Sequence, residues 1–204
     1  VLARSGYFPI QELKTFRQID SRLQGHPTTH EKLPGVRIAS GSLGQGLSVA
    51  IGSALTKKIN SESNLIYCLC GDGELQEGQI WEALMYAGSK NVDNLILSVD
   101  VNRQQICGST HDIMDLGDLK TKFNAFNWEV IEVNDGNNME SVLQNLNTAK
   151  SMTSNKKPIC VLLNTEMGAG VDYMMGSHKW HGIAPNDDEL ELALNQLEET
   201  LGDY

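Results

Sequence analysis

The sequence contains no apolar run that approaches the ~20 residues needed to span a membrane. Residues 1–6 are neither basic nor continuously apolar, which argues against a secretory signal peptide. Basic residues are scarce as well, since 16 Lys and Arg stand against 26 Asp and Glu, for a net charge of −10. A nucleic-acid-binding surface needs clustered Lys and Arg. We therefore expect neither a membrane nor a nucleic acid as a partner.

Cysteine is also rare, and the cysteines lack the paired spacing of a zinc site. Two of them lie inside one apolar run. We expect free thiols in the core, which fits a reducing compartment, and we therefore place the protein in the cytoplasm. The four residues are Cys68, Cys70, Cys107 and Cys160.

Length and composition are those of one globular domain, which we expect to cover residues 1–204. The 204-residue chain is 40% hydrophobic and 21% charged, enough for a core without disulfides or metals. The first residue is not Met, and Val1–Arg4 reads like the end of a helix, so we expect an N-terminal piece to be missing. The acidic stretch near the end predicts a solvated helix face, and Gly202 reads as a natural terminus.

Short apolar runs alternate with helical patterns along the chain. Apolar residues on one face predict helices, and continuous apolar runs predict buried strands. This alternation predicts an α/β fold, in which a doubly wound, mostly parallel sheet has helices on both faces. Segments 104–122 and 172–185 have no period and are expected to be long loops. The predicted strands are 65–70, 95–100, 128–133 and 158–163, and the predicted helices are 47–59, 80–89, 139–152 and 187–197.

Polar residues follow two of the predicted strands. Gly71-Asp72-Gly73 comes directly after the first strand, and Asn102 stands just past the next one. Ligands bind beyond the carboxyl ends of the strands in an open parallel sheet, so we expect Asp72 and Asn102 to meet there. Their oxygens suit a hard cation such as Mg²⁺. On its own, Gly-Asp-Gly is more often an ordinary turn after a strand, and the spaced Asn102 is what favours a ligand site.

This spacing of Gly71-Asp72-Gly73 and Asn102 resembles the thiamine-diphosphate-binding motif. Four segments in order resemble transketolases in particular, namely 25–27 (Gly-His-Pro), 41–46 (Gly-Ser-Leu-Gly-Gln-Gly), 71–78 (Gly-Asp-Gly-Glu-Leu-Gln-Glu-Gly) and 178–182 (His-Lys-Trp-His-Gly). The resemblance implies the diphosphate-binding type of thiamine-diphosphate fold. It also implies that Asp72, Asn102 and the backbone carbonyl of Gln104 hold Mg²⁺, or Ca²⁺ or Mn²⁺, on the cofactor. The implied cofactor contacts are Gly41, Ser42, Leu43, Gly71, Asp72, Gly73, Glu74, Asn102 and His181.

Two histidines are implied to take part in catalysis. His26 and His181 resemble family histidines that reach the donor substrate and the reactive carbon of the cofactor. Histidine suits that place because it moves protons near neutral pH. His178 is a neighbour or a participant. For His30 and His111 we expect ordinary surface positions.

Other motif residues keep two interpretations. The glycine turn 41–46 precedes a predicted helix, so its N–H groups could face an anion, but it could equally be a tight turn for close packing. Glu77 matches a family glutamate at the dimer interface, and it could equally be a favourable acidic residue in the first turn of a helix. The sequence departs from the family at Val101, where a polar residue is usual, and it has no counterpart of an upstream Gly-His pair.

The family's active site also needs a second domain, which supplies a glutamate and a stacking aromatic to the cofactor's pyrimidine ring. The resemblance therefore implies that the partner is a complementary C-terminal transketolase subunit, in an α2β2 assembly, or else that the chain is a fragment of a longer one. The implied reaction is transfer of a two-carbon ketol unit from a ketose phosphate to an aldose phosphate, as in the pentose phosphate pathway. Two alternatives stay open: a synthase subunit that condenses pyruvate with a sugar aldehyde, and a cofactor-binding paralogue without catalysis.

Overall fold

The computed structural model describes residues 1–198, so the prediction about Gly202 lies outside the described residues. It divides into two compact units, Val1–Leu43 and Gly44–Tyr204. The prediction that residues 1–204 form one domain stays a prediction.

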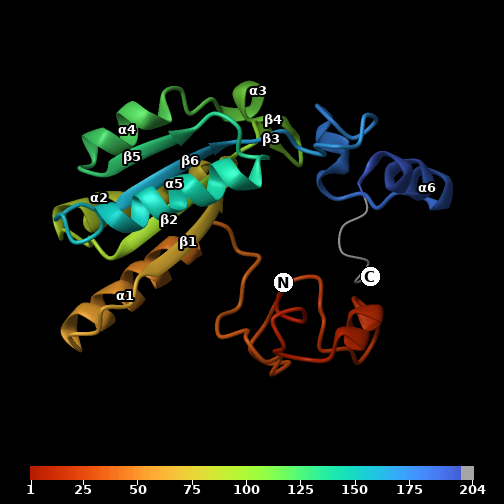
Figure 1. Ribbon diagram of the computed structural model, residues 1–204, viewed down its shortest axis with the longest axis horizontal. Coiled ribbons are helices and arrows are strands. Elements are labelled where there is room, and N and C mark those ends of the chain that lie inside the picture. The colour runs from red at the N-terminus through yellow and green to blue at the C-terminus, as the bar shows by residue number, and fades with distance from the viewer. Residues whose placement is uncertain (199–204) are drawn as a thin grey trace. The chain divides into compact units, whose positions relative to one another are not determined.

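A parallel four-stranded sheet forms the centre of the second unit (Figure 1). Its strands are β1 (Ile66–Gly71), β2 (Leu95–Val101), β6 (Ile159–Asn164) and β5 (Glu129–Val133), in that order across the sheet. In the register, Gly71 lies beside Asp100, and Asp100 lies beside Leu163. All four strands therefore end at one edge of the sheet. The prediction of a mostly parallel α/β sheet is confirmed, and each strand lies within one residue of its predicted bounds.

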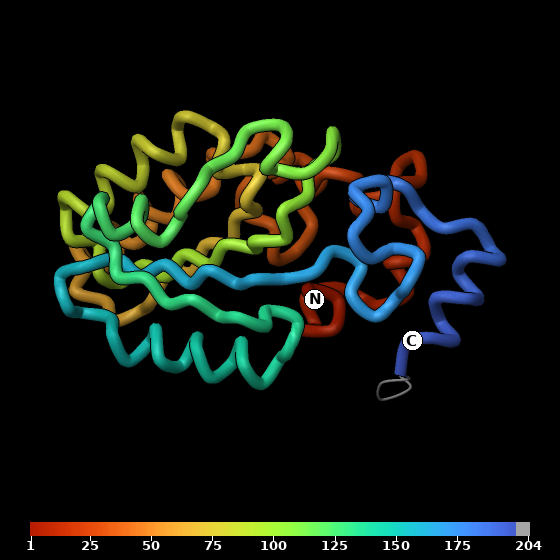
Figure 2. The backbone as a smooth tube through the Cα atoms, turned by 90° about the horizontal axis from the view of Figure 1, so that it is seen from above, coloured from red at the N-terminus to blue at the C-terminus, as the bar shows by residue number. Residues whose placement is uncertain are grey.

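Helices cover both faces of this sheet, as predicted. Alternate residues of β2 point to opposite sides, so Leu95, Leu97 and Val99 join one core cluster whereas Ile96 joins another. The first cluster includes buried residues of α1 (Gln45–Ile59) and α2 (Gly78–Ser89). The second includes Ala149 of α5 (Met139–Met152). Figure 2 shows α5 on the opposite side of the strands from α2.

The segment 104–122 is more ordered than predicted. It contains a short hairpin of β3 (Gln104–Gln105) and β4 (Gly108–Ser109), then α3 (Thr110–Met114) and the start of α4 (Leu119–Ala125). The expectation of an irregular loop is therefore wrong for much of this segment. The Asp118 side chain caps α4 by accepting the Thr121 N–H at 3.0 Å, and Phe123 of α4 is fully buried. Helices this short carry too few apolar residues to show a period.

The final described helix follows the segment 172–185. That segment is mostly turns, with a short 3₁₀ helix, η3 (His178–His181), and it leads to α6 (Asp187–Gln196). A capping box between Asn186 and Glu189 starts α6, and it explains why the acidic residues there favour a helix. Buried Ala193 marks the inner face of α6, and most of its acidic residues are exposed, as predicted.

The first unit is small and consists mainly of turns. It has one 3₁₀ helix, η1 (Ile10–Thr15), and its core is the cluster Ala3, Phe8, Leu23 and Leu33. At its start, the Tyr7 N–H donates to the Leu2 carbonyl and the Gly6 N–H to the Ala3 carbonyl, with Gly6 at φ +81°. This is the hydrogen-bond pattern of a helix C-terminus.

The outer edge of β1 has a different character from the interior of the sheet. No strand among residues 1–198 pairs with it, and Tyr67 and Leu69 are 53% and 70% exposed.

Among the described residues, no helix has both the length and the apolar composition of a membrane span. All four cysteines are free; Cys70 and Cys160 are buried and Cys68 partly so, whereas Cys107 is exposed, contrary to the expectation of a core position.

Candidate active site

Asp72 occupies a buried position immediately after β1, with 4% of its surface exposed. Its Oδ1 accepts the Gly73 N–H at 2.8 Å, and its Oδ2 accepts the Arg103 N–H at 2.7 Å. Burial raises the pKa of Asp72, backbone N–H donors oppose that rise, and the nearby Asp100 carboxylate adds to it. Asp72 is therefore buried near a second acidic residue, Asp100, and a bound cation would stabilise the negative charge of Asp72.

Asn102 lies in the connection that follows β2. Its Oδ1 accepts the Gln104 N–H at 2.8 Å, and its Nδ2 donates to Asp100 Oδ2 at 3.0 Å. Arg103 between them has φ +61°, a left-handed conformation that turns its N–H toward Asp72. Asp72 and the 102–104 turn are therefore joined by a direct hydrogen bond, and the structure brings together the residues predicted to hold the metal.

Two further residues of this network were not predicted. Asp100, the penultimate residue of β2, accepts the Asn102 amide on one oxygen and the Thr165 hydroxyl on the other. Thr165 follows β6, and its N–H also bonds the Val101 carbonyl at 3.3 Å. A signal for Asp100 was available, because an acidic residue inside an otherwise apolar strand needs a partner. Thr165 carries no such signal.

The oxygen-rich composition of this site decides which cation it fits. Among residues 1–198 no group of three His, Cys, Asp or Glu side chains is placed to hold a metal, so a zinc-type site is not found there. One buried carboxylate, one amide oxygen and one backbone carbonyl form a different set, which suits a hard cation that keeps other oxygen ligands. Asp72, Asn102 and Gln104 fit Mg²⁺ in this respect, and the metal assignment stays a prediction.

A cavity of about 290 Å³ opens beside Asp72. The segment 104–122 forms much of its wall, which gives that segment a place in the site. The lining residues are Asp72, Val101, Arg103, Thr110, His111, Asp115, Leu116, Gly117 and Leu119. Val101, the residue at which the sequence departs from the family, thus lies in the cavity wall.

Glu74 uses both carboxylate oxygens on backbone groups. Oε1 accepts the Gly44 N–H at 2.8 Å, and Oε2 accepts the Gly71 N–H at 3.3 Å. Gly44 is the N-cap of α1 and has φ +84°. A Cβ there would lie 2.9 Å from the side chains of Glu77 and Gln79, so the turn requires glycine for both reasons. The role of Glu74 as a cofactor contact stays a prediction.

Within the first unit, the structure brings two of the sequence motifs together. Gly41 has φ +112°, and a Cβ built on it would lie 2.8 Å from Cγ of His26. The Ser40 N–H also donates to the Pro27 carbonyl at 3.0 Å. The His26 ring therefore packs against the backbone of the glycine turn that continues into Ser42 and Leu43. The cofactor roles of Gly41, Ser42 and Leu43 stay predictions, as does the catalytic role of His26.

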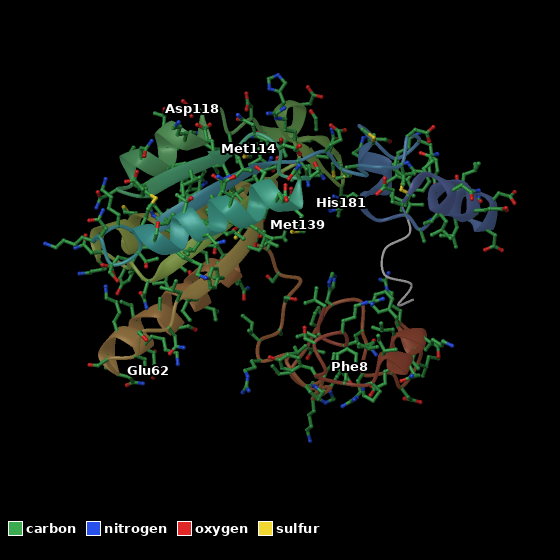
Figure 3. The ribbon with its side chains drawn as sticks, in the orientation of Figure 1. Phe8, Glu62, Met114, Asp118, Met139 and His181 are labelled. Atoms are coloured by element: carbon green, nitrogen blue, oxygen red, sulfur yellow. The ribbon has the colours of Figure 1, made fainter. Side chains whose placement is uncertain are left out.

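His181 is the last residue of η3 and is exposed. In place of the expected irregular loop it lies in a short 3₁₀ helix that packs against β3, the strand that begins at Gln104. Figure 3 shows His181 beyond the carboxyl ends of the strands. Trp180 anchors η3, since its Nε1 donates to the Tyr173 carbonyl at 3.0 Å and its ring meets the Tyr173 ring edge-on. His178 is exposed as well.

The remaining motif residues are at the surface. His30 and His111 have side chains 90% and 78% exposed, which confirms their expected surface positions. Glu77 is exposed and is the N-cap of α2, and its side chain makes no capping hydrogen bond. Its position at the start of α2 is compatible with both interpretations of this residue.

The chain is similar to known proteins over nearly its whole length. Residues 2–201 match the family model of the transketolase, thiamine diphosphate binding domain. An apulose-4-phosphate transketolase subunit of Actinobacillus succinogenes is 43% identical over 198 residues, which are 97% of this chain and 70% of that protein. A 6-deoxy-6-sulfo-D-fructose transketolase subunit of Clostridium sp. is 38% identical over 97% of this chain and 70% of its own length.

Solved structures of transketolases have the same fold as this chain. The transketolase of Campylobacter jejuni superposes with a TM-score of 0.82 at 35% identity, over 91% of this chain. The chain spans 29% of the length of that transketolase. Because the family model matches residues 2–201, the chain belongs to the transketolase thiamine diphosphate-binding domain family.

Proposed function

We propose that this chain is the diphosphate- and metal-binding subunit of a two-subunit transketolase. The observation that carries the proposal is the placement of Asp72 and Asn102. The parallel register of β1 and β2 sets both residues at one edge of the sheet, and hydrogen bonds through Arg103 and Asp100 hold them there. This edge is where open α/β sheets bind their ligands.

In this proposal, Asp72, Asn102 and the Gln104 carbonyl hold Mg²⁺, or Ca²⁺ or Mn²⁺, on the cofactor diphosphate. Thiamine diphosphate supplies, when bound, the nucleophilic carbon that accepts the two-carbon unit. Gly71 and Gly73 allow close approach of the backbone to the cofactor. His26 and His181 move protons on and off substrate hydroxyls, a step that histidine performs near neutral pH.

The partner we propose is a complementary subunit that carries the pyrimidine-binding half. Two relatives are named as transketolase subunits, and this supports a division of the enzyme between two chains. We propose an α2β2 assembly with Glu77 at the interface, a ketose phosphate donor and an aldose phosphate acceptor, as in the pentose phosphate pathway. Free thiols persist in reducing compartments, which supports a cytoplasmic location.

Reconstitution tests the proposed function. The purified chain is expected to be inactive alone and to gain ketol transfer when it is mixed with its complementary subunit, thiamine diphosphate and Mg²⁺. A chelator should abolish that activity. The product is followed by mass spectrometry, with several ketose phosphates as donors and pyruvate as the alternative donor.

Turnover by the chain alone, free of any co-purified partner, would contradict the two-subunit proposal. Consumption of pyruvate with release of CO₂ would instead favour the synthase. A complex that binds thiamine diphosphate tightly but turns over no donor would favour the non-catalytic paralogue.

A further inference from the structure

Glu74 lies in the turn after β1, two residues beyond the proposed metal ligand Asp72, and both of its carboxylate oxygens accept backbone N–H groups. One N–H belongs to Gly44 at the start of α1, and the other belongs to Gly71 at the end of β1. Thirty residues of chain separate Gly44 from Glu74, so the contact joins two turns that are distant in sequence. Gly71 directly precedes Asp72, the proposed metal ligand, and Gly44 belongs to the glycine turn 41–46, where the family resemblance implies cofactor contacts.

The Gly71 N–H needs such a partner because of its place in the sheet. The N–H groups of Ile66 and Asp72 donate toward the β2 side, to Asn94 and Asp100. Successive N–H groups of a strand alternate in direction, so the Gly71 N–H points to the unpaired outer edge. Glu74 Oε2 accepts it there and fixes the backbone one residue before Asp72.

The Gly44 N–H is one of the unpaired donors at the start of α1. Gly44 is in a left-handed conformation, and Glu74 Oε1 accepts its N–H at 2.8 Å. A carboxylate at a helix N-terminus is also favoured by the helix dipole. The same contact fixes the backbone of Gly44 at the start of α1.

Glu74 is itself held firmly. Leu75, the next residue, is fully buried, and consecutive N–H groups of Leu75, Gln76 and Glu77 bond back to Asp72, Gly73 and Glu74. These bonds close a 3₁₀ turn around the residue. The backbone at Glu74 is therefore fixed and its side chain is partly buried, whereas Glu140 is exposed to solvent.

We infer that Glu74 is a positioning residue that couples the start of α1 to the metal-binding strand end by bridging the Gly44 and Gly71 amides. This inference rests on the proposed function, because it concerns the geometry that the cofactor meets. It assigns to Glu74 an action through the backbone in place of direct contact with the cofactor. Loss of a group that orients ligands in this way typically costs about 10- to 100-fold in affinity.

The test compares three variants, each in complex with the complementary subunit. Glu74→Ala removes both acceptors. Glu74→Gln keeps one acceptor and turns an NH₂ group toward the other N–H, so its effect should be intermediate. Glu140→Gln is the matched control, because it removes one negative charge from an exposed site on α5.

Two readouts separate positioning from folding. Amide hydrogen exchange in the cofactor-free complex should accelerate at Gly44 and Gly71 in Glu74→Ala, with the β2 and β6 amides unchanged. Calorimetric titration with thiamine diphosphate at saturating Mg²⁺ should show affinity about 10- to 100-fold weaker for Glu74→Ala, less weakened for Glu74→Gln, and unchanged for Glu140→Gln. Thermal melts of the cofactor-free complexes show whether each variant is folded.

Each other outcome contradicts the inference. If Glu74→Ala binds the cofactor as tightly as the parent, the bridge does not position the site. If the affinities of Glu74→Ala and Glu74→Gln fall only in proportion to a loss of folded protein, the residue is structural. If Glu74→Ala fails to fold, Glu74→Gln decides, and parental affinity in that variant rejects the inference. The parent complex tests the proposed function separately: if it binds no thiamine diphosphate, the proposed function itself is rejected.

Discussion

Two aspartates lie at opposite edges of the sheet, Asp93 before the start of β2 and Asp72 after the end of β1, and their carboxylates have opposite surroundings. Asp93, just before the strand, pairs with Lys58 Nζ at 2.5 Å and accepts the Lys156 N–H at 3.1 Å. Asp72, at the carboxyl edge, meets backbone N–H groups and the acidic Asp100. Partial burial pushes the pKa of Asp93 upward, but the Lys58 and Lys156 hydrogen bonds outweigh it, and the pKa lies below its usual value. The pKa of Asp72 is raised by burial.

This contrast indicates a division of labour between the two edges. A carboxylate that already has its cation stabilises the fold and offers nothing to a ligand. A buried carboxylate without one is unfavourable when ionised, and it becomes favourable when a metal arrives. The amino edge is therefore expected to matter for stability, and the carboxyl edge for binding and catalysis.

The largest effect expected at the carboxyl edge is that of His181→Ala on turnover. A positioned proton donor or acceptor contributes about 100- to 10,000-fold in rate. Since His181 is exposed, its loss should leave the melting temperature nearly unchanged. Steady-state kcat/KM of the complex, with melts alongside, measures both. His30→Ala is the control, because the His30 side chain is 90% exposed and does not line the cavity beside Asp72. Parental kcat/KM in His181→Ala would show that His181 is an ordinary surface histidine.

Asp72→Ala comes next, with an expected loss of about 100-fold or more in thiamine diphosphate affinity at fixed Mg²⁺. Without metal, the same substitution has two opposing effects on the stability of the complex: it leaves the Gly73 and Arg103 N–H groups without their acceptor, and it removes an acid whose ionised form burial disfavours. The net loss of stability should therefore be small. Calorimetric titration and metal-free melts give the two values. Unchanged cofactor affinity would remove the metal assignment.

Asp93→Asn should show the reverse pattern. It weakens the contact with Lys58 and should lower the free energy of unfolding by about 1 kcal/mol, since the pair is near the surface. Cofactor affinity should stay at the parental value. Urea unfolding and calorimetry of the same preparation measure these. A fall in cofactor affinity without a fall in stability would break the proposed division between the edges.

The smallest expected effect is the pH dependence of the difference in unfolding free energy between the parent and Asp93→Asn. A carboxylate whose pKa is lowered by folding stabilises the native state above its unfolded pKa, and the stabilisation is lost as pH falls through the folded pKa. The stability difference between the parent and Asp93→Asn should therefore be full at neutral pH and should vanish below the range where Asp93 takes up its proton. A difference that persists unchanged in acid would mean that Lys58 is not its cause.

Much of this site could be predicted from the sequence, because the strands carry continuous apolar runs. Once β1 and β2 are placed, Asp72 and Asn102 must follow neighbouring strand ends. The sequence did not predict that the Arg103 N–H would donate to Asp72. That bond depends on a left-handed backbone at a residue other than glycine, which no residue pattern marks. The hairpin of β3 and β4 was missed for a related reason, since strands of two residues show no alternation.

The exposed outer edge of β1 has a practical consequence for handling the protein. An unpaired strand edge with apolar side chains, here Tyr67 and Leu69, is a template onto which other chains can add. Glu74 occupies the Gly71 N–H, so this template stops short of the carboxyl end. The purified chain is therefore expected to form reversible aggregates as its concentration rises. A Leu69→Lys substitution should weaken this association and improve the yield in the soluble fraction.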